Sequence, residues 1–278
     1  MMRVSVLSTG SSGNALVVEA DGARVLVEAG VRPQHVVTRM RDLGHDLFPR
    51  GVDGIVVTHH HNDHAAQLEP ICKALGVARV GDAHREDRAT LHLHDGIDAP
   101  RVRHRFAVRR YRAGHAFHVR DLRIRTHVLA HDAPHVAIAI ESKSHTLGFV
   151  TDVGSITHDV IDFLSSCDTV LLESNFCPEL LQIGPYPPSL RRRIAGDLGH
   201  LSNAQAADLA GEITKGGVSR VFLCHLSQVN NEPHIALRAV RDRVRDLPVE
   251  VLAHGKARTI DLDDRAPRSS YEQLHLFS

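Results

Sequence analysis

Four histidines and an aspartate crowd into one short stretch of the chain, "THHHNDH" at residues 58–64. In the spacing H-x-H-x-D-H, the candidate metal ligands are His59, His61, Asp63 and His64. Imidazole and carboxylate groups bind zinc and other divalent metals, and a ligand set without thiols favours a catalytic site over a structural one. No tetrahedral ion can take all four side chains from so tight a turn. Two ligands on each of two neighbouring ions is the easier geometry.

The elements around this stretch are expected to hold it at the end of a strand. A short buried strand, "GIVV" at 54–57, comes before it, and a helix over 65–76 is expected after it. Nearer the start of the chain, an Asp-Gly turn at Asp21 predicts a hairpin. A second hairpin is predicted over 135–152, and a helix with Ser202 as its N-cap follows later. This order predicts two packed sheets with helices outside, a four-layer α/β/β/α sandwich.

Composition limits the class of protein without selecting a function. The 278 residues are expected to form a single domain over 1–278, with a polar tail after about residue 262 that frays. Lys and Arg together number 33, as do Asp and Glu, so the net charge of +0 neither requires nor excludes an anionic partner. The four cysteines form no CxxC pair, and neither a signal peptide nor a run of 18 apolar residues is present. These features predict a soluble cytoplasmic protein with no membrane partner, and they leave the oligomeric state open.

The stretch "THHHNDH" behind a strand resembles the signature motif of the metallo-β-lactamase superfamily, whose fold is an α/β/β/α sandwich. The resemblance extends over nearly the whole chain, because further segments occur in the order seen in the YycJ/WalJ-like exonuclease group. These segments are "LSTGSSGN", "VLVEAG", "HDA", "VTDVG", "LLESN", "GPYP", "GHLSN" and "CHLSQVNNEP". Such a string of motifs is far more specific than the histidine motif alone.

The resemblance implies three further metal ligands, His131 in "LAHDAP", Asp152 in "GFVTDVG" and His225 in "VFLCHLS". His131 would complete the first metal site with the first two motif histidines. Asp152 would bridge both metals, and His225 would complete the second site with the aspartate and the last histidine of the motif. The implied cofactors are two divalent metal ions, with zinc favoured and manganese or iron as alternatives.

Four residues are expected to act beside the metals. The resemblance matches His200 in "GDLGHLSN" to a histidine that lies near the scissile phosphate and binds no metal, and Asp63 is placed with it in the catalytic set. Glu173 in "LLESN" matches an acidic residue that would orient a ligand or catalytic histidine by accepting its free N–H. The chain departs from the family pattern at Glu28 in "VLVEAG", where Asp is usual. One extra methylene shifts that carboxylate while leaving the same hydrogen bond available.

Candidate substrate contacts come from the residues themselves and are less specific. Ser11 and Asn14 in the "GSSGN" loop would donate to a substrate oxygen, or they are plain turn residues. The basic stretch "SLRRRIAG" places Arg191, Arg192 and Arg193 just before the predicted catalytic histidine, where they would bind phosphate oxygens. A second basic stretch, "RVRHRFAVRRYR", gathers several more arginines. A solvated helix face and an exposed strand are the simpler accounts of most of these arginines.

The spacing of the motifs limits the reaction that the resemblance implies. Only 48 residues separate Asp152 from His200, which leaves no room for the extra domain of ribonuclease J-like enzymes. Only 21 residues separate His131 from Asp152, so the tRNA-binding arm of ribonuclease Z-like enzymes has no place there.

What the resemblance then implies is a dinuclear metal-dependent phosphodiester hydrolase, a 5′→3′ exonuclease with DNA favoured over RNA. A metal-bridging hydroxide would attack phosphorus with help from His200. Two alternatives stay open, a small-molecule (cyclic nucleotide) phosphodiesterase and a non-catalytic, metal-bound regulatory protein.

Overall fold

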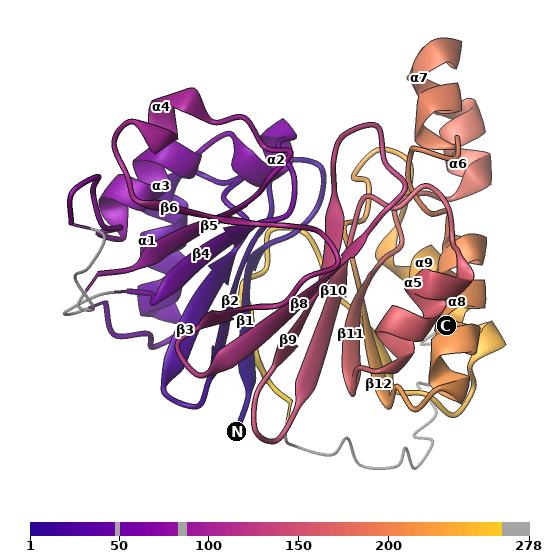
Figure 1. Cartoon of the computed structure of the whole chain (residues 1–278). Coiled ribbons are helices and arrows are strands. Elements are labelled where there is room, and N and C mark those ends of the chain that lie inside the picture. Colours follow the sequence, from indigo (N-terminus) through magenta and orange to yellow (C-terminus); the bar gives the residue numbers. More distant parts are fainter. Residues whose placement is uncertain (48–50, 83–87, 263–278) are drawn as a thin grey trace.

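Two seven-stranded sheets form the centre of the molecule, seen in a computed structural model that describes residues 1–47, 51–82 and 88–262 (Figure 1). The first sheet has the order β14-β1-β2-β3-β4-β5-β6. Its strands are β1 (Arg3–Ser8), β2 (Ala15–Ala20), β3 (Ala23–Val27), β4 (Gly54–Val57), β5 (Thr90–His94), β6 (Val108–Tyr111) and β14 (Arg258–Asp261). The second sheet has the order β13-β12-β11-β10-β9-β8-β7. Its strands are β7 (Phe117–Val119), β8 (Leu122–Val128), β9 (Val136–Glu141), β10 (Thr146–Val150), β11 (Thr169–Glu173), β12 (Arg220–Cys224) and β13 (Val249–Val251).

Helices cover the outer face of each sheet, so the four-layer sandwich predicted from the sequence is confirmed (Figure 1). Beside the first sheet are α1 (Pro33–Asp42), α2 (Asn62–Ala65), α3 (Leu68–Ala74) and α4 (Pro100–Arg103). Beside the second sheet are α5 (His158–Ser165), α8 (Asn203–Lys215) and α9 (Pro233–Arg243). Two short helices, α6 (Pro178–Ile183) and α7 (Pro188–Ile194), stand out from one end of the sandwich.

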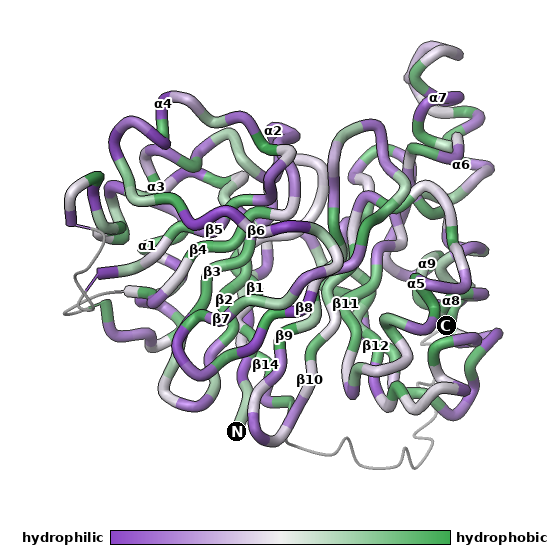
Figure 2. Tube along the Cα trace, in the orientation of Figure 1, coloured by the Kyte–Doolittle hydropathy of each residue, from purple (hydrophilic) through white to green (hydrophobic). Residues whose placement is uncertain are grey.

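Three apolar layers hold the elements together. The central one lies between the sheets and includes Val18 of β2, Ile138 of β9 and Phe222 of β12, all fully buried. The other two join each sheet to its helices, and the strands accordingly show as the apolar part of the chain in Figure 2. Because the central layer draws on strands from both halves, we propose that the chain forms one domain, as the sequence predicts. The predicted frayed tail lies outside the described residues.

Local sequence signals account for several of these elements. The predicted hairpins are present as β2–β3 and β9–β10. Asp21 and Gly22 both have positive φ, which is the backbone of the tight hairpin turn that an Asp-Gly pair favours. Ser202 caps α8 through a reciprocal capping box with Gln205. Within the described ranges, none of the helices combines the length and the apolar character that a membrane crossing requires.

One expected helix differs from the structure. The sequence predicts a single helix over 65–76, whereas the structure has two, α2 and α3. The first of them already begins inside the histidine motif, at Asn62. The break falls at Gln67, whose backbone N–H donates to the carbonyl of Ala29 (3.0 Å) and so leaves the helical pattern. This bond ties the histidine motif to the loop that follows β3.

A close backbone contact in the same place makes a glycine necessary. A Cβ on Gly30 would lie 1.7 Å from the carbonyl oxygen of Asp63, which itself accepts from the N–H of Asn14 (2.7 Å). Gly30→Ala should therefore push the motif backbone away and lower the free energy of unfolding by about 1–3 kcal/mol or more. Chemical denaturation of both proteins measures the difference.

The matched control for this substitution is Gly211→Ala in α8. There the added methyl group meets only the far end of the Arg243 side chain, at 3.2 Å. Alanine also favours the helix by about 1 kcal/mol over glycine. Equal stability of the two alanine variants would contradict the proposed role of Gly30.

Candidate metal centre

The predicted metal ligands lie at one end of the sandwich, between the two sheets. His59 and His61 follow β4, Asp152 follows β10 and His225 follows β12. Asp152 and His225 have left-handed backbone conformations, with φ of 55° and 53°. This conformation is uncommon for residues other than glycine and turns each side chain away from its strand. The ends of the strands thus direct side chains from both sheets toward one place.

Three histidines form one group of candidate ligands. His59, His61 and His131 each offer a ring nitrogen, and these atoms all lie within 4.8 Å of one another. Nε2 of His131 is 3.1 Å from Nδ1 of His61. His59 and His131 are buried, whereas a quarter of the His61 side chain is exposed.

A second group brings two carboxylates and two histidines together, Asp63, His64, Asp152 and His225. Nε2 of His64 lies 3.0 Å from Asp152 and 3.3 Å from Asp63. Nε2 of His225 lies 3.2 Å from Asp63. Asp152 also belongs to groupings with His59, so it stands between the two sets, where the sequence places a bridging ligand.

Glu173 is fully buried behind this centre and connects its parts. One carboxylate oxygen accepts from Nδ1 of His225 (2.8 Å) and from Nδ1 of His200 (2.9 Å). Both oxygens also accept backbone N–H groups, including that of Asp152 (3.1 Å). These contacts fix the ring orientations of the two histidines, which is the role predicted for Glu173 from the sequence.

Glu28 lies on the other side, against the buried face of His64. Its carboxylate accepts from the hydroxyl of Thr58 (2.5 Å) and lies 3.4 Å from Nδ1 of His64. The longer side chain that replaces the usual aspartate therefore still reaches the ligand histidine. Like two of the predicted ligands, Glu28 has a left-handed backbone conformation, with φ of 68°.

The predicted substrate contacts in the N-terminal loop separate in the structure. Asn14 is buried, accepts from the backbone N–H of Gly10 (2.9 Å) and lies 3.0 Å from Nε2 of His64. Its side chain is thus engaged with the metal centre itself. Ser11 is exposed at the tip of the loop. Substrate contact by either residue stays a prediction.

His200 lies at the rim of the centre, with 22% of its side chain exposed. Besides Glu173, its Nδ1 faces Asp152 at 3.6 Å. Burial alone would lower the pKa of His200, but the charge and hydrogen bond of Glu173 raise it above the usual value. This position, beside the candidate ligands and open to solvent, is the one that the sequence predicts for a catalytic histidine.

Sequence reasoning missed two residues at this site. His135 is fully buried, 4.2 Å from His59 between ring centroids, and Nε2 lies 2.7 Å from the carbonyl oxygen of Thr151. Asp132 lies 3.2 Å from His61 and 3.3 Å from His131. Both belong to the segment "HDAPH", which begins with the predicted ligand His131. Their closeness to His131 in the sequence was the available signal. In a chain with 22 histidines, one more carried little weight.

The electrostatics differ between the two groups of ligands. Burial would lower the pKa of His64 and His225, yet Asp152 and the other carboxylates raise that of His64 well above its usual value and that of His225 to about 10. In the first group, burial lowers the pKa of His59, and nearby histidines lower it further. The carboxylate side therefore concentrates negative charge, and the histidine side supplies neutral imidazoles.

These features test whether the site fits divalent metal ions. Nε2 of His59 is buried and has no hydrogen-bond partner among the described residues. Buried polar atoms are rarely left without a partner, and a metal ion would satisfy this one. Ionised carboxylates and the neutral imidazoles of the first group are forms that bind metal, and an ion held by the second group would take the place of the protons on His64 and His225. The donor set therefore fits divalent metal ions.

The site and the fold agree with the comparisons to known proteins. The model of the beta-lactamase superfamily domain matches residues 23–226. The chain belongs to the beta-lactamase superfamily. Exodeoxyribonuclease YycJ of Bacillus anthracis is 28% identical over 240 residues, 86% of this chain and 88% of that protein. Exodeoxyribonuclease WalJ of Streptococcus pneumoniae is 26% identical over 241 residues, 84% of this chain and 85% of that protein.

The fold of this superfamily member also has a counterpart among solved structures. The metallo-beta-lactamase fold protein YhfI from Bacillus subtilis superposes with a TM-score of 0.67 at 19% identity. The match covers 93% of this chain and 99% of that one. The resemblance to this superfamily and to its YycJ/WalJ-like members, expected from the sequence, is confirmed.

The position of Asp152 between the ligand groups leads to a test of the centre. Asp152→Ala should lower the divalent metal content of the purified protein, since it removes the carboxylate that both groups approach. Elemental analysis after dialysis measures the content. Asp162→Ala, an exposed position on α5, is the matched control and should retain the metal. Unchanged metal in the Asp152 variant would contradict the assignment.

Proposed function

We propose that the protein is a dinuclear metal-dependent phosphodiester hydrolase that removes nucleotides from the 5′ end of DNA. The observation that carries the proposal is the pair of ligand groups on either side of Asp152, with His200 held at their rim. A metal-dependent hydrolase needs ligands that hold the metal and a nearby side chain that can transfer a proton. A non-catalytic, metal-bound regulatory protein would not need a partly exposed histidine that a buried glutamate orients.

The proposed cofactors are two divalent metal ions, with zinc favoured by the histidine-rich first group. His59, His61 and His131 would hold one ion, and Asp63, His64 and His225 the other, with Asp152 shared. When bound, such a pair activates water for attack and offsets the charge of a phosphodiester. A metal content near one ion per chain would contradict the two-site assignment.

His200 would act on the leaving group. Its Nδ1 is engaged by Glu173, so the other ring nitrogen, Nε2, is available to a substrate oxygen. Because the pKa of His200 is raised, the ring stays protonated to higher pH than a free histidine, as a general acid requires. Glu173 would hold the ring while the proton passes to the departing oxygen.

DNA as the substrate, cleaved from the 5′ end, is supported by the relatives rather than by the geometry. Two exodeoxyribonucleases align with this chain over more than four fifths of their own lengths. The connections of 21 residues from His131 to Asp152 and 48 residues from Asp152 to His200 leave no room there for a separate substrate-binding domain. We also propose the cytoplasm as the location, because all four cysteines are buried and unpaired.

The arginines of α7 are not equivalent as candidate phosphate contacts. Arg193 pairs with Asp132 (2.6 Å), and Arg191 donates to the carbonyl of Gln182. Arg192 is exposed and has no such contact among the described residues. We therefore propose Arg192 as the phosphate contact. Arg193 instead holds Asp132 beside the first group of ligands.

His200→Ala should leave the metal bound and slow phosphodiester hydrolysis by about 10²–10⁴-fold, because a positioned proton donor is lost. Turnover of end-labelled DNA and elemental analysis measure the two effects separately. His234→Ala, an exposed histidine on α9, is the matched control. Loss of metal from the His200 variant would make His200 a ligand and the proposed role wrong.

Arg192→Gln should slow cleavage of DNA and reduce its dependence on salt, because one phosphate contact is lost. Hydrolysis of a small phosphodiester should change much less. Arg193→Gln should instead slow both substrates, since it releases Asp132 next to His61 and His131. Steady-state rates at several salt concentrations test this difference. Wild-type protein that turns over cyclic phosphates but no nucleic acid would support the small-molecule alternative.

A further inference from the structure

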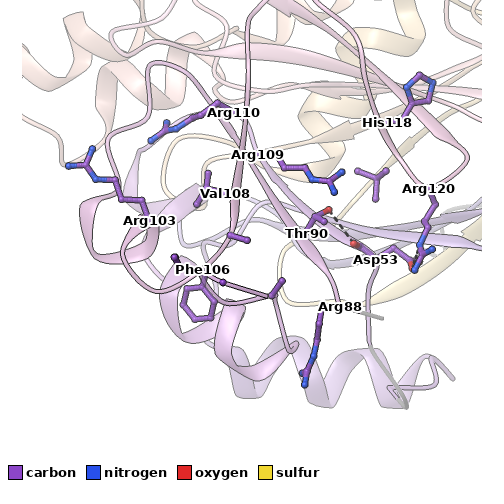
Figure 3. Close-up of a pocket in the computed structure, with 15 residues that line it drawn as sticks. Asp53, Arg88, Thr90, Arg103, Phe106, Val108, Arg109, Arg110, His118 and Arg120 are labelled. Carbon is purple, nitrogen blue, oxygen red and sulfur yellow. Dashed lines mark hydrogen bonds and ion pairs between the residues drawn. The ribbon is translucent and has the colours of Figure 1, made fainter. Parts of the chain in front are cut away.

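A cavity of about 820 Å³ lies at the opposite end of the first sheet from the metal centre (Figure 3). Its walls include Asp53, which precedes β4, and Thr90, the first residue of β5. The turn between β7 and β8 closes it from the second sheet. The metal ligands follow the other end of β4, so the length of that strand, about 13 Å, separates the two sites.

Positive charge dominates the walls of this cavity. Its lining contains five arginines: Arg88, Arg103, Arg109, Arg110 and Arg120. Asp53 is the only acidic residue among the lining residues that the structure describes, and it already pairs with Arg120 (3.2 Å). Within the described ranges, Arg88, Arg103 and Arg109 have no carboxylate partner. An anionic ligand would balance this charge.

The arginines are spread around the cavity instead of converging on one point (Figure 3). Arg109 and Arg120 lie on the side of Asp53, and Arg103 and Arg110 lie on the other side. A single phosphate cannot contact side chains so far apart, whereas a chain of phosphates can. Phe106 is only 5% exposed, so it offers no surface for base stacking. Contacts here would therefore be made to the sugar-phosphate backbone, independent of sequence.

The edge strand β6 connects this cavity to the metal centre. Arg109 and Arg110 lie on the strand and Arg112 follows it. The next residue, Ala113, lines a second cavity of about 340 Å³, whose walls include His131. From Arg109 to Ala113 the chain covers about 13 Å at the rise of an extended strand. Arg110 already donates to the carbonyls of His94 and Ile97, and Arg112 lies 3.7 Å from Asp95, so Arg109 is the arginine of β6 that stays available to a ligand.

Charged side chains on an edge strand also discourage pairing with other molecules, which accounts for arginines on β6 itself. Protection of the edge does not account for the other cations of the cavity. Arg103 comes from α4 and Arg88 from the segment before β5. That separate elements each bring an arginine to the wall of this cavity indicates a ligand-binding surface.

We propose that this arginine-lined cavity binds the backbone of the nucleic-acid strand whose end lies in the metal centre, with β6 as the path between the two sites. The inference rests on the proposed function, and it adds the path of the uncleaved part of the substrate. The cavity lies at least the length of β4 from the reacting phosphate, so it contributes only to the binding of strands long enough to span that distance.

The test compares Arg103→Gln/Arg109→Gln with wild type, both as metal-loaded protein. Both side chains are exposed, so neither substitution removes a buried contact. Fluorescence anisotropy measures binding of single-stranded DNA of twenty and of two nucleotides, protected from cleavage by phosphorothioate linkages. For the twenty-nucleotide strand, the slope of log K against log salt should become shallower by about 1.4, or about 0.7 for each lost contact. Binding of the two-nucleotide strand, which is too short to reach the cavity, should not change.

The matched control, Arg238→Gln/Arg245→Gln, removes two exposed arginines on and just after α9 and should bind both strands like wild type. An unchanged slope in the cavity variant would overturn the inference, and so would an equal loss for both lengths. Cleavage of unprotected DNA by wild type is measured in parallel. Binding that depends on the cavity without any cleavage would refute the proposed function while retaining the site.

Discussion

Four carboxylates and several histidines share a small buried space, and the rest of the structure is arranged around the need to balance their charge. Glu28, Asp63, Asp152 and Glu173 all contact candidate ligand histidines within this space. A buried carboxylate without a partner would be very costly. Glu173 is a clear case, because His200 and His225 hold its pKa at about 2 although burial alone would raise it.

The packing of the two sheets makes this arrangement possible. It brings polar residues that follow the strands of both sheets together at one end. Along their length, the layer between them is apolar, and at one end each sheet contributes the residues that follow its strands. Neither sheet alone holds a complete group of ligands, since His59 comes from the first and His131 and Asp152 from the second. Packing of the apolar layer and assembly of the metal centre are therefore one event.

The sequence predicted the layers because strands and helices have strong local signals, and the family resemblance supplied the candidate ligands that the fold gathers in one place. Strand and helix periodicities show where the chain enters and leaves the sheets, and the motif string placed His131, Asp152 and His225. Sequence could not show contacts that depend on packing. From the sequence, Asn14 is a substrate contact or a plain turn residue, and only the fold shows that it lies against His64. Arg193 gave no sign of its pairing with Asp132, which is 61 residues away.

The order in which the first sheet is completed has a consequence for synthesis of the protein on the ribosome. The strand β1 pairs on one side with β2, but on the other with β14, so that Arg3 lies opposite Asp261. Until nearly the whole chain has been made, β1 presents an unpaired edge with apolar residues on both faces. Such an edge is a template for wrong pairing with other nascent chains. Slow translation of the last third of the message would therefore prolong the period in which the polypeptide depends on chaperones.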